Sequence, residues 1–192
     1  LITRAFLGLP DPVGRFRSRA RRPRRPGHLP ECVAADAVVG ADELVEVVLV
    51  GEGSGVRTVH RYALQEGYDA VALVAGNDKD RPVELDRLLK PLRDGTADFV
   101  QGSRYLPGGD FGNMPVYRRL ATQFVHPLLF SPITGRRISD STNGFRAYRT
   151  SLLRDPRLDL NQRWLNKYEL EPYLFFKAIK LGYRVAEVPV HH

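Results

Sequence analysis

The chain has 192 residues, with 29 lysines and arginines, 22 aspartates and glutamates, and one cysteine. Its length predicts a single domain with a substantial core. The lone Cys32 excludes an intramolecular disulfide framework and fits a reducing compartment. No run of about eighteen apolar residues occurs that could span a membrane.

The net positive charge lies in residues 1–30, which hold eight arginines and one aspartate. The other 162 residues are balanced, with 21 basic and 21 acidic side chains. Because a basic arm on a neutral body is weak support for nucleic-acid binding, we expect no nucleic-acid partner. Residues 10–30 are rich in arginine, proline and glycine without an apolar period, and this composition predicts disorder. We therefore divide the chain into a basic, irregular arm over 1–43 and a folded domain over 44–192.

The folded domain shows strand and helix patterns in alternation. Strands are expected over 44–50, 69–75, 99–102, 145–148 and 183–190. Helices are expected over 56–66, 83–93, 116–130 and 165–181, with Pro127 bending or ending the third. The alternation predicts an α/β sandwich with a mostly parallel sheet flanked by helices. In that sheet, 98–102 should lie beside 69–75 or one strand away.

Two segments combine a short apolar run, a glycine and a nearby arginine. Residues 98–109 read Asp-Phe-Val-Gln-Gly-Ser-Arg-Tyr-Leu-Pro-Gly-Gly, and residues 139–149 read Ser-Asp-Ser-Thr-Asn-Gly-Phe-Arg-Ala-Tyr-Arg. In such an arrangement the strand fixes the position, glycine lets a ligand approach the backbone, and arginine binds oxygens in a fork. The pattern therefore favours a phosphorylated ligand.

These segments, together with Gly-Tyr-Asp-Ala-Val-Ala-Leu-Val at 67–74 and Gly-Tyr-Arg-Val-Ala-Glu-Val-Pro-Val at 182–190, resemble the family-2 glycosyltransferases with a GT-A fold. Within that family they look most like the dolichyl- or polyprenyl-phosphate sugar synthases, over roughly residues 52–190. The resemblance implies an inverting enzyme that moves a sugar from a nucleotide-sugar donor to a lipid-phosphate acceptor at the cytoplasmic membrane face. It also implies one reversed strand in the sheet.

The resemblance assigns a role to each polar residue of the two segments. Arg104, with Gly102 and Ser103, would contact a phosphate; the alternative is a surface arginine paired with Asp110 or another acid. Asp140 and Arg146 would line the sugar–acceptor site, with Asp140 orienting hydroxyls rather than acting as a base. The alternative is that residues 141–143 simply form a polar turn with Asp140.

Two further assignments concern helical segments. Arg118, followed by Arg119, begins the amphipathic stretch that the resemblance places near the lipid phosphate; the alternative is an ordinary solvated helix face. Glu169 and Glu171 are two residues apart and cannot share a helix face, and we expect Glu169 to point into the cleft.

The expected metal motif departs from the family pattern. If Pro82 and Glu84 are matched to the family's proline and acidic residue, the usual Asp-x-Asp pair falls on Ala75 and Asn77, and its glutamine on Lys79. Asn77, Asp78 and Asp80 could still hold Mg²⁺ or Mn²⁺ in a shifted geometry. Alternatively, the positive charge of Lys79 replaces part of the charge that a metal would provide, or the aspartates only cap the helix that follows.

The family's Val-Val-Ile-Pro strand with Asn-Glu, and its Asp-Asp-Gly-Ser motif, do not occur in this sequence. Residues 1–43 read like translated GC-rich sequence out of frame, so we expect a domain that is incomplete at its N-terminus. The competing interpretation is a non-catalytic fragment or pseudoenzyme of the same fold. Nucleic-acid binding through residues 15–25 is the third.

Overall fold

The structure is a computed structural model that describes residues 2–7, 33–38, 44–50, 54–75, 81–165 and 169–191. The strands are β1 (Ile2–Leu7), β2 (Val33–Val38), β3 (Leu44–Val50), β4 (Ala70–Ala75), β5 (Phe99–Ser103), β6 (Arg146–Arg149) and β7 (Val185–Pro189). The helices are α1 (Ser54–Glu66), the 3₁₀ turn η1 (Pro82–Glu84), α2 (Leu85–Arg93), α3 (Val116–Leu120), the π-helical turn η2 (Ala121–Val125), α4 (His126–Thr134), α5 (Thr150–Leu153) and α6 (Leu170–Lys180).

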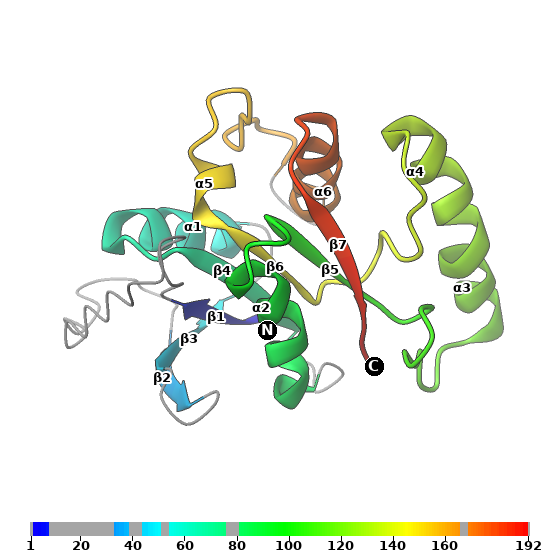
Figure 1. Cartoon of the computed structure of the whole chain (residues 1–192), viewed down its shortest axis with the longest axis horizontal. Helices are drawn as coiled ribbons and strands as arrows, with labels where there is room; N and C mark the ends of the chain where they lie inside the picture. Colours follow the sequence, from blue (N-terminus) through cyan, green and yellow to red (C-terminus); the bar gives the residue numbers. More distant parts are fainter. Residues whose placement is uncertain are drawn as a thin grey trace.

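The strands form one sheet in the order β2-β3-β1-β4-β6-β5-β7 (Figure 1). Strands β4, β5 and β7 run in one direction, and β6 runs in reverse between β4 and β5. The α/β class, the reversed strand and the position of β5 one strand away from β4 are thus confirmed. Fewer neighbouring strands are parallel than expected, because among the described strands only β5 and β7 form a parallel pair.

Helices cover both faces of the sheet. The alternation of side chains along β4 sends Val71 and Leu73 to one face and Ala72 and Val74 to the other. The first pair packs in a core with α1, α5 and α6, and the second packs against α2. Four leucines at helical spacing form the buried face of α2: Leu85, Leu88, Leu89 and Leu92.

The helical stretch from Val116 to Thr134 lies at the far side of β5 and β7 from α1 (Figure 1). Pro127, which we expected to bend or end this stretch, does not end it. Immediately before it, the backbone N–H of His126 donates to the carbonyl of Ala121, five residues back, which is a π-helical bond. The N–H that proline lacks therefore falls where the helix returns from π to α geometry. The helix ends at Gly135, whose φ of +73° suits glycine.

Two other expectations need correction. Strands β1 and β2 lie within the segment 1–43 that we expected to be an irregular arm, whereas residues 10–30 lie outside the described residues, so their disorder stays a prediction. Helix α6 begins at Leu170 rather than at Leu165, whose N–H closes a turn on the carbonyl of Gln162.

Candidate functional site

The two motif segments meet at the C-terminal end of β5. Because β6 runs antiparallel to β5, the loop that leads into β6 lies beside the residues that follow β5. Ser103 Oγ lies 2.6 Å from Ser139 Oγ, and the N–H of Gly102 donates to the carbonyl of Phe145 at 2.9 Å. A Cβ at Gly102 would lie 2.6 Å from that carbonyl oxygen, so the glycine is required for the approach of these two backbones.

Arg104 and Asp140 form a buried, two-pronged ion pair. Arg104 Nε donates to Asp140 Oδ2 at 2.7 Å, and Arg104 Nη2 donates to Asp140 Oδ1 at 3.0 Å. The side chains are 3% and 0% exposed. The partner of Arg104 is therefore Asp140 rather than Asp110, and the predicted phosphate-binding cation and sugar-binding carboxylate neutralise each other.

The polar turn that we kept as an alternative for residues 141–143 is also present. The N–H and hydroxyl of Thr142 both donate to Asp140 Oδ1, at 3.1 and 3.0 Å, and Arg104 Nη2 donates to the Thr142 hydroxyl at 2.7 Å. Asp140 thus holds its own loop and fixes Arg104 against it. The Arg104–Asp140 pair and its bonds to Thr142 thus form the buried base of the loop over residues 139–145, which we call the floor of the loop.

Arg146 reaches the same loop from β6. Its side chain is 2% exposed, and it donates to the carbonyl of Asn143 and, at 3.0 Å, to the carbonyl of Glu171 at the start of α6. Gln101 Nε2 donates to the same Asn143 carbonyl at 2.8 Å. Three buried polar atoms around this point have no hydrogen-bond partner among the described residues: Gln101 Oε1, Asn143 Nδ2 and Arg146 Nε. Arg146 therefore joins the loop to α6, and the three unpartnered polar atoms lie buried beside this junction.

The structure favours Glu171 over Glu169 as the acidic residue of this site. Glu171 Oε2 lies 3.5 Å from Arg146 Nη2, and 3.6 Å from the position that a Cβ on Gly144 would occupy. Glu169 is exposed. Sequence spacing showed that only one of the two could face the cleft but could not show which, because that depends on where α6 begins.

Glu187 is a site residue that the sequence analysis missed. It lies in β7, and its carboxylate accepts from the N–H of Ser139 at 3.0 Å, from the hydroxyl of Ser139 at 2.8 Å and from the N–H of Asp140 at 3.2 Å. An acidic residue in the middle of an apolar strand was the available signal. Glu187 holds the start of the loop as Arg146 holds its end.

The stretch α3–η2–α4 carries an exposed apolar surface. Eight large apolar side chains on it are at least 50% exposed: Val116, Tyr117, Leu120, Phe124, Val125, Leu128, Leu129 and Ile133. Arg118 is exposed and its guanidinium has no hydrogen bond or ion pair among the described residues, while the guanidinium of Arg119 stacks on the ring of Phe111 at 4.0 Å. Tyr105 ties this stretch to the end of β5, because its hydroxyl hydrogen-bonds to that of Thr122 in η2. None of the helices described in the structure is long and apolar enough to cross a bilayer.

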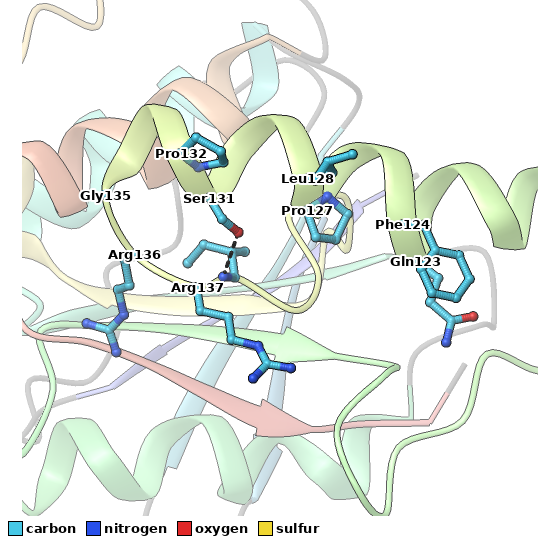
Figure 2. Close-up of a pocket in the computed structure, with 10 residues that line it drawn as sticks. Gln123, Phe124, Pro127, Leu128, Ser131, Pro132, Gly135, Arg136 and Arg137 are labelled. Carbon is cyan, nitrogen blue, oxygen red and sulfur yellow. Dashed lines mark hydrogen bonds between the residues drawn. The ribbon is translucent and has the colours of Figure 1, made fainter.

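A cavity of about 560 Å³ opens between this helix and the loop that follows it (Figure 2). Phe124, Pro127 and Leu128 line its helical side, and Arg136, Arg137 and Ile138 line its loop side. Its last lining residue, Ile138, directly precedes Ser139 and Asp140 in the chain, so the loop side of the cavity leads into the polar loop.

The predicted metal and diphosphate residues Asn77, Asp78, Lys79 and Asp80 lie outside the described residues. Over the described ranges, no group of three or more histidine, cysteine, aspartate or glutamate side chains is placed to hold a metal ion. Both the metal hypothesis and the Lys79 alternative therefore stay predictions.

The carboxyl groups with clearly shifted pKa values lie away from this region. Arg184 donates to Asp98, which precedes β5, and this hydrogen bond lowers the pKa of Asp98. Arg157 likewise lowers the pKa of Asp155 through its side-chain hydrogen bonds. Asp98 stands at the opposite end of β5 from Arg104, so this ion pair stabilises the fold rather than the candidate site.

No protein-family model matches the chain. The chain is 35% identical over 130 residues to an undecaprenyl-phosphate mannosyltransferase of Micrococcus luteus, a match that covers 68% of this chain and 51% of that protein. It is 35% identical over 129 residues to a polyprenol monophosphomannose synthase of Mycolicibacterium smegmatis, covering 67% and 47% respectively. It is 32% identical over 121 residues to a dolichyl-phosphate hexose transferase of Haloferax volcanii, covering 62% and 49%. The chain thus spans about half the length of the curated relatives it matches.

Proposed function

The chain belongs to the family-2 glycosyltransferases of the polyprenyl- and dolichyl-phosphate type, and on this premise we propose that it transfers a sugar from a nucleotide-diphosphate donor to a polyprenyl-phosphate acceptor. The observation that carries the proposal is the identity of about one residue in three to several enzymes whose names all state a polyprenyl or dolichyl phosphate. The two motif segments on which the resemblance was first recognised meet at one end of the sheet, which supports a common site.

The acceptor would approach from the side of α3–η2–α4. A polyprenyl phosphate is a long apolar chain with one anionic end, and it is delivered at a membrane surface. The exposed apolar side chains of this helix, with Arg118 beside them, suit peripheral contact with a bilayer. Peripheral membrane association is therefore part of the proposal.

The loop over residues 139–145 would form the floor of the sugar–acceptor site. Asp140 is fully buried and accepts hydrogen bonds from Arg104 and Thr142, so its role in the proposal is to position this loop. Arg146 and Glu187 hold the two ends of the same loop.

A divalent cation, Mg²⁺ or Mn²⁺, is the proposed cofactor. Asn77, Asp78 and Asp80 would hold it, since carboxylate and amide oxygens are the ligands that hard cations prefer. When bound, such an ion would offset the charge of the leaving diphosphate.

A transfer assay tests the proposal. The purified chain would be incubated in detergent with radiolabelled GDP- and UDP-sugars and with undecaprenyl phosphate, and lipid-linked label would be separated by chromatography. Product is expected with undecaprenyl phosphate and none with undecaprenol, because the transfer requires the anionic oxygen as nucleophile. If a chain that circular dichroism shows to be folded forms no labelled lipid from any donor, the non-catalytic interpretation holds instead.

A further inference from the structure

The cavity beside α4, which we call the helix groove, has one apolar wall and one cationic wall (Figure 2). Phe124, Pro127 and Leu128 come from η2 and α4, and Ile138 closes the groove from the loop. Arg136 and Arg137 are its cations, and none of its ten lining residues is acidic. The groove therefore suits a ligand that is apolar along its length and anionic at one end.

The loop side of the groove is held in place by the fold. The N–H of Ile138 donates to Ser131 Oγ of α4 at 3.0 Å, a bond drawn in Figure 2. Arg136 Nη2 donates to the carbonyl of Val185 in β7 at 2.6 Å. These two contacts fix the loop to the helix on one side and to the sheet on the other, so Arg137 projects from a fixed backbone.

The arginine side chains of this region differ in the partners that they already contact. Arg104 is paired with Asp140, Arg119 lies over Phe111, and Arg136 is bonded to Val185. Arg137, in contrast, is exposed and makes no hydrogen bond or ion pair with any described residue. Of the two groove arginines, Arg137 is the one whose guanidinium is available to a ligand.

Resting on the proposed function, we propose that the helix groove receives the phosphate-bearing end of the polyprenyl phosphate, with Arg137 as the cation that binds its phosphate. The first isoprene units would lie against Phe124 and Leu128, where they remove apolar surface from water. The guanidinium fork of Arg137 matches two phosphate oxygens, which strengthens a charge-assisted hydrogen bond.

This placement also directs the acceptor towards the candidate site. Arg137 is three residues before Asp140, and Ser139 between them is held by Glu187. A phosphate on Arg137 would thus lie at the entrance to the loop whose floor is the Arg104–Asp140 pair. The rest of the lipid would leave along the exposed apolar surface of α4.

The test uses farnesyl phosphate, a soluble isoprenoid phosphate, and calorimetric titration of the full chain. Arg137→Gln should weaken its binding about tenfold or more, the effect of losing a hydrogen bond between charged groups. The same variant should bind farnesol as the wild type does, because farnesol lacks the phosphate. Phe124→Ser should weaken both ligands. Arg154→Gln is the matched control, since Arg154 is an exposed arginine at the end of α5, and should change neither.

Three outcomes of the binding experiments would overturn the inference, and a fourth comes from the transfer assay. Unchanged farnesyl phosphate affinity in a folded Arg137→Gln variant is the first, and the absence of any binding by the wild type is the second. The third is Arg137-dependent binding of phosphatidylglycerol vesicles without binding of farnesyl phosphate, which would make the groove a site for bilayer headgroups. The transfer assay separates this inference from the proposed function: a wild type that forms labelled lipid, with an Arg137→Gln variant of equal KM, would leave the function standing and reject the groove.

Discussion

Arg104→Met should destabilise the protein far more than a substitution that breaks an equally short ion pair at the surface. Arg104 Nε and Asp140 Oδ2 are 2.7 Å apart, with side chains 3% and 0% exposed. Lys90 Nζ and Asp94 Oδ2 of α2 are also 2.7 Å apart, but their side chains are 68% and 47% exposed. The two pairs thus differ in burial at equal separation, and Lys90→Met is a matched control.

The magnitude follows from what each substitution leaves behind. Methionine at 104 leaves the Asp140 carboxylate buried without its cation, and breaking such a pair costs about 3–5 kcal/mol. At the control site, water replaces the lost partner, and an exposed helix pair is worth about 0.3–0.5 kcal/mol. With a urea m-value of about 2 kcal/mol/M, the midpoint should fall by about 1.5–2.5 M for Arg104→Met and by about 0.2 M for Lys90→Met.

Urea unfolding followed by circular dichroism measures both shifts. Arg104→Met combined with Asp140→Asn should cost less than the sum of the two single substitutions, because the second change removes the charge that the first left unpaired. Equal midpoint shifts in the two methionine variants, or strictly additive costs in the double variant, would refute the buried ion pair as the floor of the loop.

Two further predictions concern charged groups elsewhere. Arg184 lowers the pKa of Asp98 below its ordinary value of about 3.9. The ion pair therefore stabilises the protein above that pH, and the stabilisation is lost as the pH falls through the folded-state pKa. The loss of unfolding free energy caused by Asp98→Asn should be present at pH 6 and shrink towards pH 3, and a loss that stays constant would contradict this. If a cation bound by Asp78 and Asp80 supports diphosphate binding, calorimetric titration of GDP or UDP should need Mn²⁺ and fail with Asp80→Asn, whereas binding that survives EDTA and fails only with Lys79→Ala would assign the charge to Lys79.

Local patterns in the sequence predicted most of the folded domain. The helix expected over 83–93 is present as η1 and α2, and four leucines at helical spacing form its buried face. The helix expected over 56–66 ends at Glu66, and Gly67 after it has a φ of +77°, as glycines that follow helix ends commonly do. Such features depend on neighbours a few residues away, which is why a single sequence reveals them.

Contacts between distant segments could not be predicted in the same way. Glu187 bonds to Ser139 and Asp140 across 48 and 47 residues, and no local pattern links a residue of β7 to that loop. Pro127 was expected to bend or end its helix because its missing N–H is a local property. The π-helical turn that precedes it, and the hydrogen bond between Thr122 of that turn and the distant Tyr105, could not be read from the sequence. The sequence thus indicated that the segments 98–109 and 139–149 belong to one site, but it did not show which of their residues pair with each other.

Two arginines near the loop over residues 139–145, Arg104 and Arg137, differ in how readily they could bind a phosphate. A phosphate could draw Arg104 away only by leaving Asp140 buried and unpaired, and that cost of about 3–5 kcal/mol would have to be met by the new contact. A phosphate on Arg137 displaces only water, because that side chain is exposed and has no partner among the described residues. Burial thus favours Arg104 as part of the framework of the site and, under our proposal, makes Arg137 the better cation for binding, whereas the resemblance assigned the phosphate contact to Arg104.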